Sequence, residues 1–256
     1  MLKIKELNDN GDFRSEECIA YLKEADVVVT NPPFSLFREY IKQLMDYKKK
    51  FIILANNNAI TYKEFFPYIK NGEVWLGRTL FTGKMPFFRV PDNYPLANER
   101  FEKRADGLYK QVNAITWYTN VPNDSNREVL DMYKKYNPTD YPTYDNYNAI
   151  ECGRMEYLPY DYEGVIGIPI TGLKYLWSDG TIHTEHNGNP KQFEIVGCAD
   201  ADITPNGWKG MSADFVEKYY AQGNTGAYKE GNRLACYVNK GKAIVPYKRI
   251  LIRRIA

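Results

Sequence analysis

The sequence predicts an α/β fold in its first half and a loop-rich, partly β region in its second half. Three short apolar runs, at 27–29, 51–54 and 74–76, are separated by two stretches with helical patterning. Alternation of strand and helix is typical of a parallel sheet with helices packed on both of its faces.

The first predicted elements are a helix and a buried strand. Ser15 is suited to cap a helix whose first turn carries Glu16 and Glu17, because carboxylates are favourable at the positive end of the helix dipole. The continuous β-branched run Val27–Val29 then predicts a strand that is buried on both faces.

A second helix is predicted after Asn31-Pro32-Pro33-Phe34, with Ser35 as its cap and apolar residues at helical spacing over 36–45. The strand at 51–54 follows. Thr61 and Glu64 then have the spacing of a capping box, which predicts a third helix. We expect the runs 87–90 and 114–118 to be antiparallel edge strands of the same sheet.

From about residue 120 the composition changes, and Pro, Tyr, Asn and Asp become frequent. Short strand-like runs at 165–168, 193–196 and 250–252 are separated by turn residues. The charge is also uneven, since residues 206–256 hold ten basic and three acidic side chains. A basic region suits a polyanionic partner, although a solvated basic surface has the same composition.

Composition excludes several other classes of protein. No apolar run approaches the roughly 18 residues that a membrane span needs, and residues 1–6 lack the apolar core of a secretory signal, so we expect a cytoplasmic protein. The four cysteines are far apart and predict free, mostly buried thiols. His183 and His186 have no acidic or thiol partner at metal-ligand spacing, so we predict no metal site and interpret both as surface residues.

The tetrapeptide Asn31-Pro32-Pro33-Phe34 carries the clearest chemistry. It follows a predicted strand and precedes a helix, where open α/β sheets bind ligands. The Asn31 side-chain carbonyl and the Pro32 backbone carbonyl can accept hydrogen bonds from a planar, conjugated amine, and the prolines stiffen the loop that holds them. Phe34 offers a flat surface for an extruded base. Base amines of DNA or RNA and glutamine amides of proteins all meet this description.

Longer stretches resemble the EcoRI-type adenine-specific modification methylases. The similarity includes residues 11–15, 25–40 and 58–64, together with 144–147 and 164–171. This resemblance implies a partial Rossmann-like methyltransferase sheet and S-adenosylmethionine as the methyl donor. It also implies that the chain methylates the N6 amine of adenine in double-stranded DNA, with a restriction endonuclease as a functional partner.

The resemblance also implies site residues and a division of the chain. Asn31, Pro32, Pro33 and Phe34 would hold the target adenine, and Asp12 and Phe13 would contact the adenine ring of the cofactor. From the residues alone, Asp12 is better suited to a turn or cap. The loop near Phe87 and Phe88 could pack against the flipped base, but the alternative of a plain core strand is favoured there. Residues 1–120 would form the catalytic core and 121–256 a DNA-recognition region.

One feature departs from the family pattern. No glycine-rich loop precedes Asn31, and only about 30 residues lie before it, too few for the three strands that the resemblance implies there. We therefore expect a chain that lacks the N-terminal part of a longer enzyme, and whose cofactor pocket is partly built. A DNA-binding protein without catalytic activity, and a methyltransferase for RNA or a protein amide, stay open as alternatives.

Overall fold

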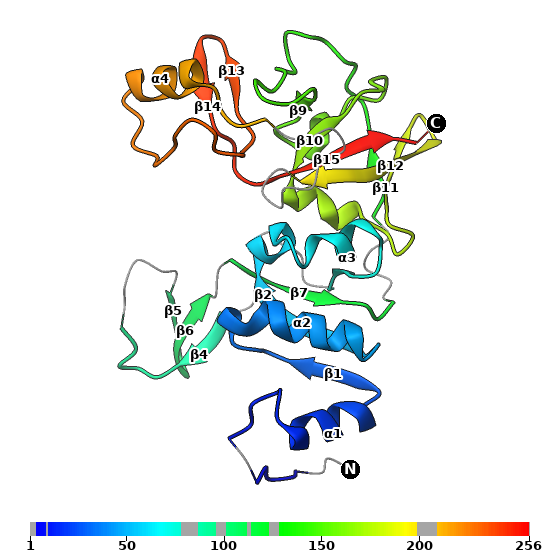
Figure 1. Cartoon of the computed structure of the whole chain (residues 1–256), viewed down its shortest axis with the longest axis vertical. Coiled ribbons are helices and arrows are strands. Elements are labelled where there is room, and N and C mark those ends of the chain that lie inside the picture. The colour runs from blue at the N-terminus through cyan, green and yellow to red at the C-terminus, as the bar shows by residue number, and fades with distance from the viewer. Residues whose placement is uncertain are drawn as a thin grey trace.

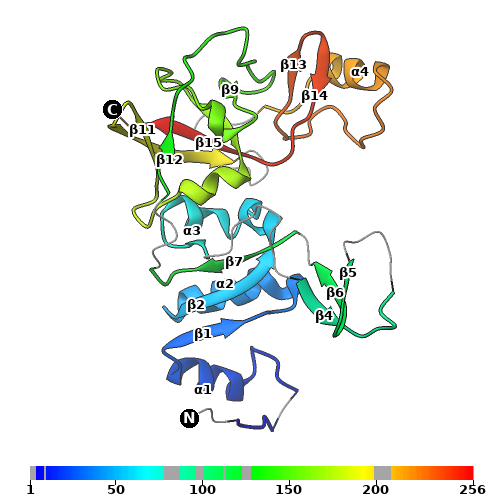
Figure 2. The same ribbon diagram turned by 180° about the vertical axis from the view of Figure 1, so that it is seen from behind.

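The computed structural model describes residues 4–8, 10–77, 87–95, 101–111, 114–122, 128–198 and 209–255. Its two larger sheets lie one above the other along the long axis (Figure 1), with the N-terminal half at one end and the C-terminal half at the other. A smaller three-stranded sheet projects beside the N-terminal half, and Figure 2 shows the same arrangement from behind.

The first sheet contains the strand order β1-β2-β7-β3. Its members are β1 (Val27–Thr30), β2 (Lys50–Asn56), β7 (Ile115–Thr119) and β3 (Trp75–Leu76). β1 and β2 are parallel, with Val28 opposite Phe51, whereas β7 is antiparallel to both β2 and β3. The α/β prediction is therefore confirmed in its coarse form. The position of β7 was predicted wrongly, because it lies inside the sheet and not at an edge.

Three helices accompany this sheet: α1 (Glu16–Glu24), α2 (Phe37–Asp46) and α3 (Phe66–Lys70). Ser15 caps α1 as predicted, since its side chain accepts a hydrogen bond from the Cys18 amide. The two other predicted caps were wrong. A 3-10 turn, η1 (Phe34–Leu36), precedes α2, and a second, η2 (Asn57–Thr61), ends at Thr61. Ser35 thus lies inside η1, and Thr61 is the last residue of η2, five residues before α3 begins at Phe66.

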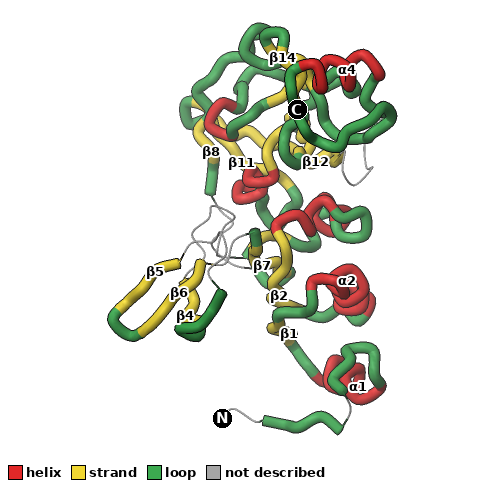
Figure 3. The backbone as a smooth tube through the Cα atoms, turned by 90° about the vertical axis from the view of Figure 1, so that its left-hand side faces the viewer, coloured by secondary structure: helices red, strands yellow, loops and turns green. Residues whose placement is uncertain are grey.

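The prediction that β1 is buried on both faces was also wrong. Val27 is 42% exposed and Val29 is 65% exposed, while Val28 packs against the core. α1 and α2 lie on the same side of the strands (Figure 3), so the alternate side chains of β1 face away from them. β-branched residues favour a strand whether or not a second layer covers it.

The three-stranded sheet has the order β4-β6-β5 and is antiparallel. It consists of β4 (Phe87–Val90), β5 (Phe101–Arg104) and β6 (Gly107–Gln111). The run at 87–90 was predicted to join the first sheet, but it pairs only with β6 among the described strands. Phe88 is 46% exposed, so the alternative of a core strand is wrong as well.

The C-terminal half is built on a six-stranded sheet with the order β8-β11-β12-β15-β10-β9. Its strands are β8 (Leu130–Asp131), β9 (Ile150–Glu151), β10 (Ile166–Pro169), β11 (Thr181–His186), β12 (Asn189–Cys198) and β15 (Arg249–Arg254). Two 3-10 turns, η3 (Met155–Tyr157) and η4 (Ile170–Tyr175), join its strands. A helix, α4 (Ala213–Ala221), packs against a hairpin of β13 (Tyr237–Asn239) and β14 (Lys242–Ile244). The partly β, loop-rich character predicted for this half is confirmed.

One continuous hydrophobic core joins the two larger sheets. Phe37 of α2 and Ile53 of β2 belong to the same buried cluster as Ile182 and Ile252 of the C-terminal sheet. The turn after α3 also touches the turn before β11, because a Cβ on Gly72 would lie 2.6 Å from the amide nitrogen of Gly180. Gly72 has a φ of +67°, which glycine adopts without strain. The boundary at residue 120 stays a prediction, and no gap in the core marks it.

A buried ion pair anchors the start of β15. Arg249 donates to Glu151 at 2.7 Å, and the side chains of the two residues are only 10% and 3% exposed. The Tyr144 hydroxyl donates to the same carboxylate, and Arg249 Nη1 donates to the Tyr247 carbonyl at 2.6 Å. Burial and the neighbouring carboxylate hold the pKa of Tyr144 well above its usual range. The segment Tyr247–Lys248 is thereby fixed to the sheet.

Candidate functional site

A cleft lies at the carboxyl end of β1. It has a volume of about 700 Å³ and is open to solvent. Its walls come from the segment before α1, from α1, from β1 and the loop after it, and from the first turns of α2. The lining residues are Asn10, Gly11, Asp12, Phe13, Cys18, Tyr21, Leu22, Ala25, Val27, Val28, Thr30, Asn31, Pro32, Pro33, Leu36, Tyr40 and Gln43.

The cleft brings together most of the residues that the sequence singled out. Asn31, Pro32 and Pro33 line it at the end of β1, and Asp12 and Phe13 line it from the segment before α1. Pro32 is buried, whereas Asn31 is exposed. Phe34 does not line the cleft and lies beside it in η1, 44% exposed. The Leu36 amide donates to the Pro33 carbonyl at 2.9 Å, and this bond fixes the turn that carries Phe34.

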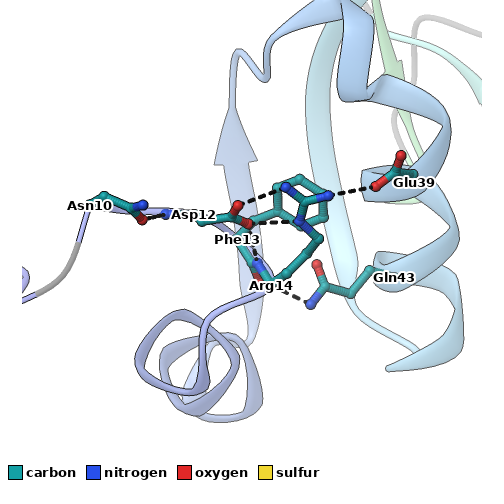
Figure 4. A network of polar contacts seen from close by, with 6 residues as sticks. All are labelled: Asn10, Asp12, Phe13, Arg14, Glu39 and Gln43. Atoms are coloured by element: carbon teal, nitrogen blue, oxygen red, sulfur yellow. Dashed lines mark hydrogen bonds and ion pairs between the residues drawn. The ribbon is translucent and has the colours of Figure 1, made fainter.

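Asp12 is held in one orientation by Arg14 (Figure 4). Both carboxylate oxygens accept hydrogen bonds from the guanidinium, at 2.9 and 2.7 Å, and the Arg14 amide donates to Oδ1. The side-chain bond from Arg14 is the largest cause that lowers the pKa of Asp12 to about 2. The group is therefore an ionised acceptor at neutral pH. Two oxygens have about four acceptor positions, so capacity is left for a ligand.

Asp12 also has the turn role that its residue type suggested. Its amide donates to the Asn10 side chain at 2.9 Å, and its carbonyl accepts from the Ser15 amide that begins α1. These bonds fix the segment before α1 in the wall of the cleft. A turn role and a ligand role for Asp12 are therefore compatible.

Phe13 and α2 are joined across the cleft. The Phe13 ring meets the Tyr40 ring edge to face, with centroids 4.9 Å apart. The Phe13 carbonyl accepts from Gln43 Nε2 at 3.1 Å, as Figure 4 shows. The other atom of that amide, Gln43 Oε1, is buried and has no hydrogen-bond partner among the described residues. A buried carbonyl without a donor is costly, so this atom is a candidate ligand acceptor.

Sequence reasoning missed Gln43, Tyr40, Tyr21 and Cys18 as cleft residues. In the helical pattern of residues 36–45, Gln43 falls with Arg38, Glu39 and Lys42 on the side opposite the apolar residues. The available signal was the spacing of Tyr40 and Gln43, which lie three residues apart and therefore on one face of the helix. That spacing predicts that Tyr40 and Gln43 share one face of α2, but it does not predict that Phe13 packs against them.

The other residues that the sequence raised lie elsewhere. His183 stacks on Trp177 and His186 on Tyr160, each with ring centroids 3.8 Å apart, so neither is a simple surface residue. Within the described ranges, no group of three His, Cys, Asp or Glu could hold a metal. All four cysteines are free, and Cys152, Cys198 and Cys236 are buried, as predicted. No helix in the described residues is long and apolar enough to cross a bilayer.

The basic C-terminal region is partly neutralised by carboxylates. Arg249 pairs with Glu151 as described above, Arg253 with Glu194 at 2.6 Å and Arg254 with Glu163 at 2.5 Å. A count of charges along the sequence overstates how many of these arginines can meet a polyanion.

A polar, proline-containing loop thus lines the cleft at the carboxyl end of a parallel strand. Comparison with family models identifies the family. Residues 1–255 match the family described as adenine-specific methyltransferase EcoRI, and the chain belongs to that family.

Curated relatives agree with this assignment. The Type II methyltransferase M.EcoRI of Escherichia coli is 43% identical over 77% of this chain and 59% of its own length. The Type II methyltransferase M.MpnI of Mycoplasma pneumoniae is 34% identical over 77% of this chain and 59% of its own length. The chain thus spans about three fifths of the curated relatives that it matches. No solved structure matches it significantly.

Proposed function

We propose that this chain carries the catalytic loop of a DNA methyltransferase that transfers a methyl group from S-adenosylmethionine to the N6 amine of adenine. The observation that carries the proposal is one cleft in which Asn31, Pro32 and Pro33 face Asp12 and Phe13. Membership of the adenine-specific family supports the choice of adenine and of DNA. The alternatives, RNA and protein amides, are outcomes of the experiment below.

The cleft fits the cofactor. Its volume lies within the range of about 300–1,000 Å³ that is usual for small-molecule sites. Phe13 and Tyr40 supply aromatic surface for an adenine ring, and Asp12 and the unpaired Gln43 Oε1 are acceptors for its amine. When bound, S-adenosylmethionine supplies an activated methyl group on a sulfonium, so no strong general base is needed.

The loop after β1 is suited to hold the target amine. The side-chain carbonyl of Asn31, which is exposed, can accept one N–H of the amine, and the backbone carbonyl of Pro32 the other. Two acceptors on the amine hydrogens favour a pyramidal nitrogen, whose lone pair is a better nucleophile. Because both prolines restrict φ and Pro32 is buried, these acceptors are held in place before the substrate arrives.

Phe34 is placed to receive an extruded base. A base inside a duplex cannot reach such a loop, so it must leave the stack. The Phe34 side chain is half exposed in a fixed 3-10 turn directly after the two prolines. Stacking of a base on an aromatic ring contributes about 1–3 kcal/mol.

Several segments that could meet DNA gather at one edge of the molecule. The loop between β1 and α2, the end of β2 and the sheet of β4, β5 and β6 all lie on the left-hand side in Figure 1. The three-stranded sheet carries Arg89, Lys103, Arg104 and Lys110, and the exposed Phe88. Cations suit the phosphates and aromatic rings suit the bases. A restriction endonuclease with the same recognition sequence would be the functional partner.

The test is methyl transfer from labelled S-adenosylmethionine to duplex DNA and, in parallel reactions, to RNA and to protein, followed by digestion of the labelled nucleic acid to nucleosides. We expect N6-methyldeoxyadenosine from the wild-type chain and none from Asn31→Ala, while duplex binding is kept. Asn189→Ala, at the first residue of β12, is the matched control and should retain transfer. Label in a ribonucleoside or in protein would move the substrate to RNA or an amide. Absence of any transfer by the folded wild-type chain at saturating substrates would contradict the proposal.

A further inference from the structure

A second hollow lies on the other side of the first turn of α2 from the cleft. It has a volume of about 470 Å³ and is lined by Arg38, Asn56, Asn58, Thr61, Tyr62, Lys63, Glu64 and Lys248. β1 and β2 are parallel neighbours, so the loops at their carboxyl ends emerge at the same edge of the sheet. Asn31 follows β1 and Asn58 follows β2, while Arg38 is only four residues after Phe34. The hollow therefore adjoins the catalytic loop.

The charge of this hollow is positive. Three cations, Arg38, Lys63 and Lys248, line it together with a single carboxylate, Glu64. Arg38 lies 4.5 Å from the centre of the Tyr62 ring, and its Nε is 3.5 Å from Glu64. That contact is long and both side chains are more than half exposed, so the carboxylate screens the guanidinium weakly. The arginines of β15, by contrast, pair at 2.5–2.7 Å.

The polar lining is arranged to donate hydrogen bonds. Asn56 Oδ1 accepts from the Asn58 amide at 2.8 Å, and Asn58 Oδ1 accepts from the Tyr247 hydroxyl. Because both side-chain carbonyls are engaged within the loops, the groups that the two amides can offer a ligand are mainly N–H donors. The bond from Tyr247 also fixes the adjacent Lys248 against a loop 189 residues away in the sequence. The site is thus assembled from both halves of the chain.

We propose that this hollow binds a backbone phosphate of the DNA strand that carries the target adenine, a role that rests on the function proposed above. A nucleotide that swings out of the stack turns about its own backbone, so the phosphates beside it must be held close to the catalytic loop. Cations and N–H donors around a small hollow suit an anionic, acceptor-only group. A neutral base edge carries no net charge for the three cations around the hollow to balance, whereas a phosphate does.

The test is the salt dependence of binding to a short mixed-sequence duplex, measured without methyl transfer. The logarithm of the binding constant falls linearly with the logarithm of the salt concentration, and each phosphate contact contributes about −0.9 to that slope. We expect the double variant Lys63→Gln, Lys248→Gln to reduce the magnitude of this negative slope by roughly 0.9 or more. The reduction should be similar for DNA duplexes of unrelated sequence. Glu64→Gln removes the opposing charge and should tighten binding at low salt.

Lys23→Gln is the matched control. It removes the same charge from an exposed lysine in the last turn of α1, just before the amino end of β1 and therefore at the opposite edge of the sheet. An unchanged slope in the double variant, or an equal fall in Lys23→Gln, with normal duplex binding by the wild type, would overturn the phosphate site but leave the proposed function standing. Failure of the folded wild-type chain to bind duplex would overturn both. Melting temperatures of all variants show whether they are folded.

Discussion

Replacing Arg249 by methionine tests the buried ion pair that fixes Tyr247 and Lys248 to the C-terminal sheet. The Arg249 side chain is 10% exposed, and its guanidinium donates to Glu151 through both Nε and Nη2 and to the Tyr247 carbonyl through Nη1. Methionine keeps much of the apolar stem and removes every donor. The Glu151 carboxylate, 3% exposed, would then keep only the Tyr144 hydroxyl among the partners described here.

The expected cost is large because one charge of a buried pair stays behind. Removal of one partner of a buried ion pair destabilises a protein by about 3–5 kcal/mol. Arg253→Met makes the same change in the same strand, but Arg253 and Glu194 are 51% and 44% exposed. Exposed pairs contribute about 0–1 kcal/mol. The two variants should therefore differ by at least about 2 kcal/mol.

Urea denaturation of the wild type and both variants, followed by tryptophan fluorescence, measures this difference. A thermal scan should agree, with a fall in Tm of about 2–4 °C for each kcal/mol in a chain of this size. Equal losses in Arg249→Met and Arg253→Met would refute the reasoning that burial decides the cost. Duplex binding by Arg249→Met at a temperature where it is folded should also weaken, because Tyr247 and Lys248 lose their anchor.

Three further predictions concern the cleft. The pKa of Asp12 is about 2 in the folded chain, below its ordinary value of 3.8. The ionised carboxylate therefore stabilises the folded state above about pH 4, and this contribution is lost as the pH falls through 2. Arg14→Gln should bring the midpoint of the Asp12 carboxyl signal in NMR back towards 3.8. Gln43→Met should weaken S-adenosylmethionine binding in calorimetry roughly fivefold, the equivalent of about 1 kcal/mol for one hydrogen bond, whereas Lys42→Met on the exposed side should not. Phe34→Ala should lower the rate of methyl transfer roughly 5- to 150-fold, from a stacking energy of about 1–3 kcal/mol, and leave cofactor affinity unchanged; an equal loss of both would contradict a role in stacking.

The sequence predicted the elements whose signals are local. Ser15 was correctly predicted as the cap of α1, because the capping residue, the acidic first turn and the apolar face of the helix lie within a few residues of one another. The tetrapeptide after β1 was located correctly because the strand and the prolines are adjacent in the chain. Asp12 and Phe13 were assigned to the cofactor site because of the resemblance to the family, and no pattern in the residues themselves predicted that they would line the cleft.

The errors came from contacts that are distant in the sequence. The pattern of Val27–Val29 could not tell whether a second layer covers the strand, and Val29 is exposed. Ser35 has the residue type of a cap, but the turn fixed by the Pro33 carbonyl makes it part of η1. The hollow containing Lys248 could not be predicted, because it depends on the pairing of Tyr247 with Asn58.

The strand order β1-β2-β7-β3 has a consequence for how the chain folds. β3 lies at residues 75–76, and its only partner among the described strands is β7 at 115–119. β3 therefore cannot pair within the sheet as soon as it emerges from the ribosome. It can do so only after β7, about 40 residues further along the chain, has emerged as well. Meanwhile β2 presents an unpaired edge along its apolar residues Phe51–Ala55. Unpaired edges of this kind favour association between chains. The nascent protein is therefore prone to aggregation until β7 pairs with β2.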